Sequence, residues 1–221
     1  MLQQNLNRIF EKISQGNNLG EKITLVGATK TMPVSVINDA VELGLPVVAE
    51  NRVQEFNEKH ELIDSRAEQH FIGHLQTNKV KYLVGKVALI HSVDSVHLAE
   101  EINRIATNRG ITQNILIEIN VGGELSKSGF TITDCAKAVE DICSAFTNVR
   151  VKGLMAMLPR SDDKDLLAEL CLKMRAEFDK LKQRGYDMEY LSMGMSNDYE
   201  IAIRNGSNLI RLGRTIFGDR F

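Results

Sequence analysis

A lysine follows directly on an apolar, strand-like run near the start of the chain. The run ITLVGAT ends at residue 29, and Lys30 comes next, ahead of Thr31, Met32 and Pro33. An amine at such a position either stays a solvated surface group or reacts with a carbonyl compound to form an imine. The residues that the fold gathers around Lys30 decide between these two interpretations.

Two later stretches have the composition of a phosphate site. SMGMSNDYE contains Ser196 and gives Asn197 and Glu200 the spacing of a capping box at a helix start. RLGRT contains Gly213, where a backbone can approach a ligand closely, and the amides of Gly213 and Arg214 are available as donors. Serine hydroxyls and free backbone N–H groups match phosphate oxygens, although such residues also form ordinary turns.

The arginine of LIRLG raises the question of a buried charge. Side chains alternate along a strand, so Arg211 shares one face with Leu209 and Gly213. If that face lies inside the protein, the guanidinium needs hydrogen-bond acceptors around it. Two interpretations stay open: Arg211 pairs with a buried carboxylate such as Glu118 of ILIEIN, or it donates to a ligand atom.

The elements that would position these residues follow from the apolar pattern. Short β-branched runs alternate with amphipathic, charged stretches, which is typical of repeated βα units around a parallel sheet. We expect eight strands, at residues 23–29, 46–51, 69–75, 88–94, 115–121, 150–158, 190–196 and 209–217. Helices are expected within residues 33–44, 51–63, 96–110, 133–146 and 162–185, several of them closed by glycine, with an extra helix over residues 5–14.

Eight parallel strands with helices between them predict an α/β fold, a closed (β/α)8 TIM barrel in one domain over residues 1–221. An open doubly wound sheet is the alternative. In such a barrel the loops that follow the strands converge over one mouth, where ligands bind. Asn51, at the end of AEN, and Met155, in GLMAM, would also face this mouth, although asparagine is a common N-cap and methionine is more often core.

Other polar groups near strand ends have no assigned role. The strand-end stretch GHLQTNK and the loop GGELSKSG offer His74, Gln76, Asn78, Lys79, Ser126, Lys127 and Ser128, all of which fit a polar rim. The histidines do not have the spacing of metal ligands, so we interpret His60, His70, His74, His91 and His97 as helix, core or rim residues. No Ser-His-Asp arrangement is evident either.

Composition excludes several functional classes. A net charge of −2 and a pI near 6.2 argue against a nucleic-acid or anionic-membrane partner. Cys135, Cys143 and Cys171 lack CxxC spacing, which suits a reducing compartment, and we interpret them as buried packing residues. The sequence contains no signal peptide and no run of about 18 apolar residues, so we expect a cytoplasmic protein.

Taken together, the mouth would hold an amine, a phosphate cradle and a buried guanidinium. A phosphorylated aldehyde held by a lysine as a Schiff base is pyridoxal 5′-phosphate. A lysine that is desolvated near a positive neighbour has the lowered pKa that imine formation needs. The residues therefore favour pyridoxal phosphate as the ligand.

GATKTMP, AENRVQEF, HFIGHLQTNK, SKSGF, GLMAM and LSMGMSNDYEIAIRNGSNLIRLGRTIFG, in this order, closely resemble the pyridoxal phosphate homeostasis protein family. The resemblance covers nearly the whole chain. It implies the barrel of the alanine racemase N-terminal domain, with Lys30 as the Schiff-base lysine and Arg211 opposite the pyridine nitrogen. It also implies Ser196, Gly213 and Arg214 as phosphate-binding positions.

The family's role implies reversible binding of the cofactor, transfer to apo enzymes that use it, and effects on amino-acid balance. The resemblance also implies a monomer, because the second domain of the racemases is not expected here. The sequence departs from the family pattern at Ala49 and Arg52, which flank the otherwise intact Asn51 position, and at Arg214, where many relatives carry a small hydroxyl residue. The Arg214 contact would then fall to its backbone amide.

Two kinds of enzyme remain as alternatives. One is a racemase or decarboxylase that uses pyridoxal phosphate, and the other is a cofactor-free aldolase that forms a Schiff base with a sugar phosphate. The racemase alternative needs a second proton-transferring group opposite Lys30. Tyr82, Tyr186 and Tyr190 are expected away from the mouth, and only Tyr199 is expected near it.

Overall fold

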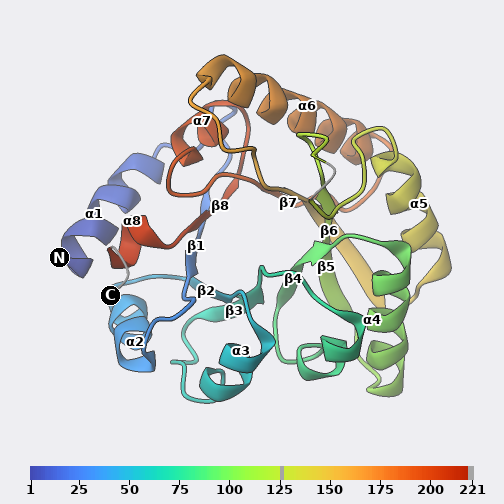
Figure 1. Cartoon of the computed structure of the whole chain (residues 1–221), viewed down its shortest axis with the longest axis horizontal. Coiled ribbons are helices and arrows are strands. Elements are labelled where there is room, and N and C mark those ends of the chain that lie inside the picture. The colour runs from blue at the N-terminus through green and yellow to red at the C-terminus, as the bar shows by residue number, and fades with distance from the viewer. Residues whose placement is uncertain (125–126, 219–221) are drawn as a thin grey trace.

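Eight parallel strands close into a barrel in the computed structural model, which describes residues 1–124 and 127–218. Each strand pairs with its sequence neighbours, and β8 pairs with β1 (Figure 1). The strands are β1 (Thr24–Ala28), β2 (Val47–Glu50), β3 (Glu68–Phe71), β4 (Leu89–Val93), β5 (Gln113–Ile119), β6 (Val149–Ala156), β7 (Tyr190–Ser192) and β8 (Leu209–Leu212). The predicted (β/α)8 barrel is confirmed, and the open doubly wound sheet is excluded.

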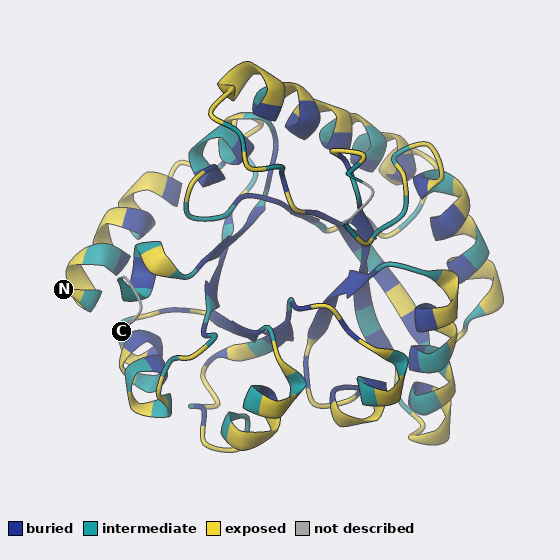
Figure 2. Ribbon diagram, in the orientation of Figure 1, coloured by how far each residue is buried: buried dark blue, intermediate teal, exposed yellow. Residues whose placement is uncertain are grey.

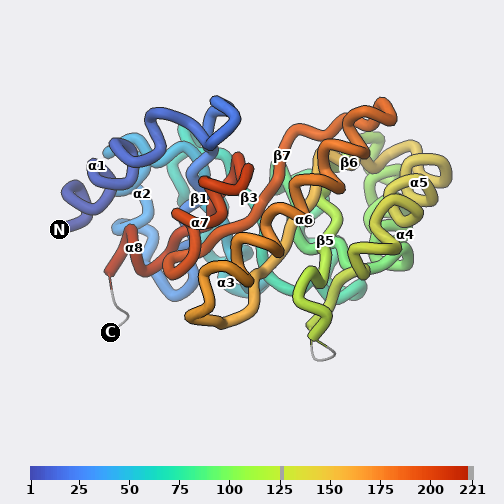
Figure 3. The backbone as a smooth tube through the Cα atoms, turned by 90° about the horizontal axis from the view of Figure 1, so that it is seen from above, coloured from blue at the N-terminus to red at the C-terminus, as the bar shows by residue number. Residues whose placement is uncertain are grey.

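Helices surround the barrel and connect its strands. They are α1 (Leu2–Ile13), α2 (Val34–Glu42), α3 (Val53–Lys59), α4 (Val96–Asn108), α5 (Cys135–Ala145), α6 (Lys164–Gln183), α7 (Tyr199–Arg204), α8 (Arg214–Phe217) and the 3-10 helix η1 (Thr77–Tyr82). The expected extra helix is α1, which packs beside α2 and α8, so the first and last described elements are neighbours (Figures 1 and 3). The segments that leave β6 and β8 emerge on the same side of the barrel (Figure 3).

The strands are buried on both faces, which explains why their sequences are nearly continuous apolar runs (Figure 2). Outward-facing residues of β1 and β8, such as Leu25, Ile210 and Leu212, pack against Ile37 of α2 in the outer core. Inward-facing residues form two smaller clusters. One contains Val26, Val47, Ala49 and Leu209, and the other contains Leu89, Leu116 and Met155.

Two local predictions are wrong. The eighth strand ends at Leu212, and residues 214–217 form α8, because the N–H groups of Ile216 and Phe217 both donate to the Gly213 carbonyl. The β-branched and aromatic composition of this segment favours a strand, but Ile216 is buried against the outer core on a helical turn.

Of the cysteines, Cys135 and Cys171 are buried as expected, whereas Cys143 is exposed.

A buried ion network ties the ends of β1 and β2 to α3. Glu50, the last residue of β2, is 3% exposed, and its Oε1 accepts from Thr29 Oγ1 at 2.7 Å and from Lys59 Nζ at 2.8 Å. Lys59 Nζ also lies 3.0 Å from Glu55 Oε2 and 3.3 Å from the Thr29 carbonyl oxygen. Burying a carboxylate is costly unless a cation and hydrogen-bond donors accompany it, so the position of α3 against β1 depends on Lys59.

We predict that Lys59→Met lowers the free energy of unfolding by about 3–5 kcal/mol, because Glu50 then becomes a buried, unpaired charge. Urea unfolding followed by circular dichroism measures this change. Lys137→Met is the matched control, since Lys137 pairs with Asp141 on the surface of α5 and such pairs contribute about 0–1 kcal/mol. Adding Glu50→Gln to Lys59→Met should recover part of the loss. Equal, small effects of the two lysine substitutions would contradict the proposed dependence.

Candidate functional site

Lys30 lies in a tight turn whose neighbours on both sides are held in place. The Met32 N–H donates to the Thr29 carbonyl at 2.9 Å, and Thr31 has a φ of 66°. A left-handed backbone is strained for a β-branched residue, at a cost of about 1–3 kcal/mol. The Thr31 N–H donates to Glu55 Oε2 at 2.7 Å, which helps to hold that conformation. The ion network around Lys59 therefore also fixes the turn that carries Lys30.

The Glu55 carboxylate is suited to this role. Burial acts to raise the pKa of Glu55, but the Thr31 N–H and the Lys59 ammonium together hold that pKa below its usual range. Glu55 thus stays an ionised acceptor for the backbone of the turn.

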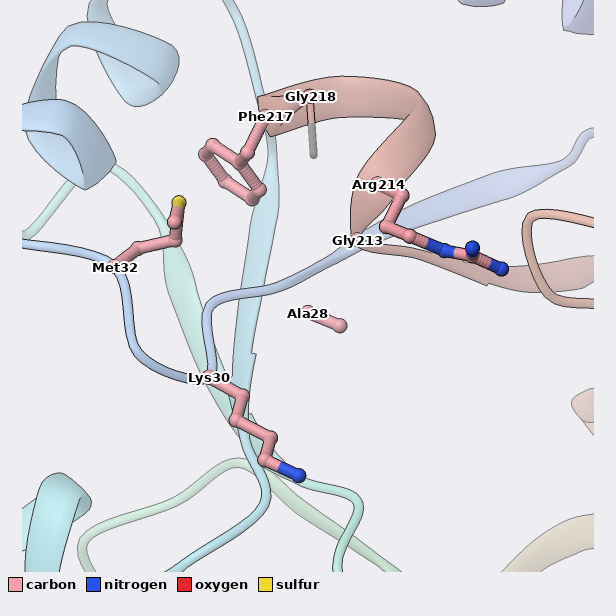
Figure 4. A pocket seen from close by; sticks show the side chains of 7 residues that line it. All are labelled: Ala28, Lys30, Met32, Gly213, Arg214, Phe217 and Gly218. Carbon is pink, nitrogen blue, oxygen red and sulfur yellow. The ribbon is translucent and has the colours of Figure 1, made fainter. Parts of the chain in front are cut away.

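The Lys30 ammonium itself has no hydrogen-bond or ion-pair partner among the residues that the structure describes, although its neighbours Thr29 and Thr31 do. Its side chain is half-buried and lines a pocket together with Ala28, Gly213 and Arg214. Figure 4 shows Lys30 extending from the turn after β1, with Gly213 and Arg214 across the pocket at the junction of β8 and α8. A partly desolvated amine without a counter-ion is available for covalent chemistry.

Unpaired backbone N–H groups gather on the far side of this pocket. Within residues 1–124 and 127–218, the N–H groups of Ser196, Asn197, Gly213 and Arg214 have no acceptor. The two segments meet, because the Thr215 N–H points to Ser196 Oγ at 3.4 Å. Several convergent N–H donors form a cradle for an anion with more than one oxygen.

The glycine at position 213 is not required by the protein's own packing. Its φ is −110°, which any residue adopts, and a Cβ there would meet the Ala28 carbonyl oxygen at 3.4 Å, an ordinary contact. The absence of a side chain instead keeps the pocket open beside the unpaired N–H groups. The sequence-based interpretation of Gly213 as a point of close ligand approach is consistent with this geometry.

Arg211 lies inside the barrel, as the alternation of side chains along β8 predicts. It is 5% exposed, and its Nη1 donates to the carbonyl oxygen of Ser192 at 2.9 Å and to the hydroxyl of Ser192 at 2.5 Å. Its Nη2 donates to the Ala156 carbonyl at 3.0 Å. An ion pair with Glu118 is absent from the described residues, so that interpretation of Arg211 is wrong. Arginine has five N–H donors. The three bonds just described use both Nη1 hydrogens and one Nη2 hydrogen, so the Nε hydrogen and the second Nη2 hydrogen remain available.

Carboxylates still act on Arg211 from a distance. Burial lowers the pKa of the Arg211 guanidinium to about 10, while Glu118 and Asp198 act to raise it. Burial also raises the pKa values of Glu118 and Asp198, and Asp94 adds to the effect at Glu118. Arg211 remains a cation at neutral pH, with a hydrogen-bonding edge that no described residue occupies.

Asn51 lies at the mouth, directly after β2. The backbone of Asn51 packs directly against Gly73. Any larger residue at position 73 would clash, because its Cβ would fall 1.9 Å from the Asn51 carbonyl oxygen. Of the residues that depart from the family pattern, Ala49 is buried in the inner core and Arg52 is exposed beside Glu55 at 3.6 Å. The Asn51 side chain makes no hydrogen bond to the described residues, so a ligand contact stays a prediction.

Met155 is 1% exposed and packs with Leu89 and Leu116 in the inner core. Its packing against a ligand ring also stays a prediction, because little of its surface is open in this structure. Met157, which directly follows β6, is 40% exposed.

Other predicted residues lie at the rim. Arg214 is exposed, and its Nη2 donates to Asn197 Oδ1 at 3.1 Å. The capping box predicted at Asn197 and Glu200 is wrong, since the N-cap of α7 is Asp198 and its carboxylate accepts from the Met195 N–H at 2.6 Å.

The remaining rim residues show varied surroundings. Lys127 pairs with Glu124 at 2.5 Å, His74 lies 3.5 Å from Asp94, Lys79 is half-buried, and Gln76, Asn78 and Ser128 are exposed, whereas Ser126 lies outside the described residues.

The structure thus brings Lys30, Gly213 and Arg214 to one pocket and joins Ser196 to its edge. The lining of that pocket does not include Asn51, Met155 or Arg211. Arg211 precedes Gly213 by two residues, which places both on the same face of the chain. No cluster of metal-ligating side chains occurs in the part of the chain that the structure describes. No helix among these residues has the length and apolar content needed to cross a membrane.

Comparison with known proteins gives a consistent family assignment. Residues 4–221 match the family described as alanine racemase, N-terminal domain. The pyridoxal phosphate homeostasis protein of Aquifex aeolicus (strain VF5) is 43% identical over 220 residues, covering 98% of this chain and 94% of that protein. The protein of the same name from Escherichia coli (strain K12) is 34% identical over 224 residues, covering 98% and 95%.

A solved structure agrees with the sequence comparison. PipY of Synechococcus elongatus PCC7942, in a structure described as having PLP bound, superposes with a TM-score of 0.85 at 30% identity, covering 99% of this chain and 100% of that one. Together these matches confirm the resemblance seen in the sequence. The chain therefore belongs to the alanine racemase N-terminal domain family and, within it, to the pyridoxal phosphate homeostasis proteins.

Proposed function

We propose that this protein binds pyridoxal 5′-phosphate reversibly through Lys30 and serves vitamin B6 and amino-acid homeostasis without robust catalysis. The observation that carries the proposal is the unpartnered Lys30 ammonium in a pocket with the unpaired N–H groups of Gly213 and Arg214. The deprotonated amine would condense with the aldehyde of the cofactor, with loss of one water molecule, to form an imine. The cofactor named in the description of the PipY structure supports this ligand.

The residues of the site fit the chemical groups of the cofactor. Ser196, with the backbone N–H groups of Gly213 and Arg214, would bind the phosphate. The free edge of Arg211 would donate to the ring nitrogen, and Asn51 would contact the ring substituents. When bound, pyridoxal phosphate supplies an electron sink for reactions at carbon. Met155 completes the proposed set beneath the ring.

The chain's own groups argue against efficient proton transfer. A guanidinium donates hydrogen bonds and keeps its proton, so Arg211 would hold the ring nitrogen as an unprotonated acceptor and a weaker electron sink. A racemase also needs a second acid or base opposite the lysine. Tyr199, the tyrosine expected near the mouth, packs in the outer core, and its hydroxyl lies 3.3 Å from Glu200.

The other tyrosines do not replace it. Tyr190 lies inside the barrel next to both inner clusters, Tyr82 lies in η1 near Lys79 and Lys81, and Tyr186 packs against Arg184. These surroundings support a protein that holds the cofactor rather than one that turns over amino acids.

The names of the relatives support a role in the homeostasis of the cofactor. We propose a cytoplasmic monomer whose single domain spans residues 1–221 and which delivers the cofactor to apo enzymes that require it. Two alternatives remain if the tests below give contrary results. One is a racemase or decarboxylase that uses the same cofactor, and the other is a cofactor-free aldolase. The absorption spectrum of the purified protein, with and without added cofactor, separates the aldolase from the other two, because the imine of pyridoxal phosphate absorbs visible light and the imine of a sugar phosphate does not.

We predict that Lys30→Ala abolishes both the visible imine band and the adduct fixed by borohydride, because no other amine occupies the proposed position. Absorption spectroscopy and mass spectrometry of the reduced protein measure these two signals. Folding should survive, since the Lys30 ammonium has no partner among the described residues. Lys127→Ala is the control and should keep both signals. An adduct on Lys127 in the Lys30→Ala variant would show that Lys127, and not Lys30, forms the imine.

We predict that Ser196→Ala weakens binding of pyridoxal phosphate by about 1–3 kcal/mol, the size of a lost hydrogen bond to a charged group. Binding of unphosphorylated pyridoxal should barely change, because it lacks the group that Ser196 would contact. Titration of the wild type and the variant with both ligands gives the comparison. Equal weakening of the two ligands would reject the phosphate assignment.

We predict that alanine and other common amino acids racemise in the presence of the protein no faster than with free pyridoxal phosphate, beyond a small factor. The reason is that Lys30 approaches from one direction and no described tyrosine faces it. Deuterium exchange at the α-carbon, followed by chiral chromatography, measures this rate. Steady turnover to the opposite enantiomer that disappears in Lys30→Ala would identify an enzyme instead.

A further inference from the structure

A buried chain of hydrogen bonds runs from Arg211 through the middle of the barrel. The Arg211 guanidinium donates to Ser192 Oγ, and Ser192 Oγ lies 3.1 Å from His91 Nδ1. His91 Nε2 lies 3.0 Å from His70 Nδ1, and His70 Nε2 lies 3.3 Å from Glu68 Oε2. Because β4 and β7 are not neighbours in the barrel, the contact between His91 and Ser192 spans the interior.

This chain is costly to build, which suggests that it has a use. His91 and Ser192 are at most 1% exposed and His70 is 3% exposed, whereas the Glu68 side chain is 64% exposed at the other end. The interiors of such barrels are ordinarily filled by branched apolar side chains, and buried polar groups cost free energy unless each is paired. Here each link has a partner within hydrogen-bond distance, so the chain is a complete network.

The end groups determine the direction of every bond. Arginine only donates, so Ser192 Oγ accepts from Arg211, and it can meet His91 Nδ1 with either its own hydrogen or its second lone pair. A hydrogen bond from His70 lowers the pKa of Glu68, which keeps that group an ionised acceptor at the opposite end. Burial, reinforced by the Arg211 charge, lowers the pKa of His91 well below its usual range and keeps its imidazole neutral.

With one hydrogen on each imidazole, one arrangement satisfies these constraints. His70 carries its hydrogen on Nε2 and donates to Glu68, and His91 carries its hydrogen on Nε2 and donates to His70 Nδ1. The bare Nδ1 of His91 then accepts the Ser192 hydrogen. With the opposite tautomers, the bare Nε2 of His70 would face the Glu68 carboxylate, and two acceptors would lie against each other. Glu68 therefore selects the tautomer of both histidines.

We propose that His70 and His91 are positioning residues that transmit this polarity from Glu68 to Ser192 and so fix the Arg211 guanidinium that faces the ring nitrogen of pyridoxal phosphate. The proposal rests on the proposed function for its ligand, but the hydrogen-bond directions are properties of the protein alone. Ser192 offers Arg211 a lone pair because its hydrogen is engaged by His91. Without that engagement the hydroxyl can rotate, and its hydrogen competes with the Arg211 donor.

The binding test compares two ligands that differ at one atom. Pyridoxal phosphate accepts a hydrogen bond at its ring nitrogen, whereas 1-deaza-pyridoxal phosphate has a C–H group there. We expect His91→Leu to reduce the ratio of their dissociation constants, deaza analogue over natural ligand, by about 3- to 10-fold, the effect of about one hydrogen bond. His91→Asn should restore most of the ratio, because its amide oxygen can take the place of Nδ1 as an acceptor.

His97→Leu is the matched control, since His97 is 76% exposed on α4, and it should leave the ratio unchanged. A general loss of structure in His91→Leu would weaken both ligands together and leave the ratio at the wild-type value. An unchanged ratio in folded His91→Leu, or a failure of His91→Asn to restore it, would overturn the proposal.

The second test uses the protein without ligand. Long-range ¹H–¹⁵N correlation spectra of histidine-labelled protein report the tautomer of each imidazole, with His70→Gln and His91→Gln providing the assignments. Both histidines should carry hydrogen on Nε2 and a bare Nδ1, and Glu68→Leu, a change at the exposed end, should weaken that preference at His70. Hydrogen on Nδ1 of either histidine would overturn the proposal. Failure of the wild type to bind pyridoxal phosphate would reject the proposed function, and the spectra would still decide the direction of the chain.

Discussion

The buried guanidinium of Arg211 is the constraint on which the interior of this barrel depends. An unpaired cation inside a protein costs several kcal/mol, so its donors must meet acceptors. Two backbone carbonyls and the Ser192 hydroxyl meet three of them, and Glu118 and Asp198 supply negative charge from farther away. The hydroxyl then needs an acceptor for its own hydrogen, which brings His91 into the interior. One charged side chain thus accounts for the polar residues in a region that is otherwise apolar.

Two lysines near the mouth differ in their partners. Lys59 lies between Glu50 and Glu55 and joins α3 to the ends of two strands. Lys30 lies close by in the chain's fold, yet it has no partner among the described residues. The Lys59 amine is thus fully engaged in the protein's own contacts, whereas the Lys30 amine is open to the pocket. The network around Lys59 therefore serves Lys30 indirectly, by holding Thr29 and Thr31 on either side of it.

Much of this architecture is predictable from sequence because it depends on local patterns. Buried strands give apolar runs, and amphipathic helices alternate with them, so each of the strands was located to within a few residues. Lys30 was predicted as a site residue because it directly follows such a run, and Gly213 because a glycine within one allows close approach of a ligand. The last strand shows the limit, since the segment RTIF has strand-like composition, but its burial against α1 and α2 makes it the helix α8.

Long-range pairings were beyond the reach of sequence patterns. His70 and His91 are separated by 21 positions, and Ser192 is a further 101 positions away, so nothing local connects them. The two histidines were therefore interpreted as helix, core or rim residues, without a link between them. The partners of Lys59 likewise depend on the position of α3 against β2, which no local pattern gives. Partners of this kind become visible only when the closure of the barrel brings β3, β4, β7 and β8 to one interior.

The same arrangement distinguishes holding a cofactor from using it. Both tasks need an amine and a phosphate site, and in the proposed function both are supplied by residues of the barrel itself, Lys30 and the loops after β7 and β8. Reversing a stereocentre needs one more group, an acid or base on the face opposite the amine. The tyrosines of this chain instead lie in the outer core, in the lower barrel interior or on the surface, each beside other partners. In the proposed complex Arg211 would strengthen the distinction, because a permanent donor at the ring nitrogen would favour retention of the ligand and disfavour the build-up of negative charge that proton removal requires.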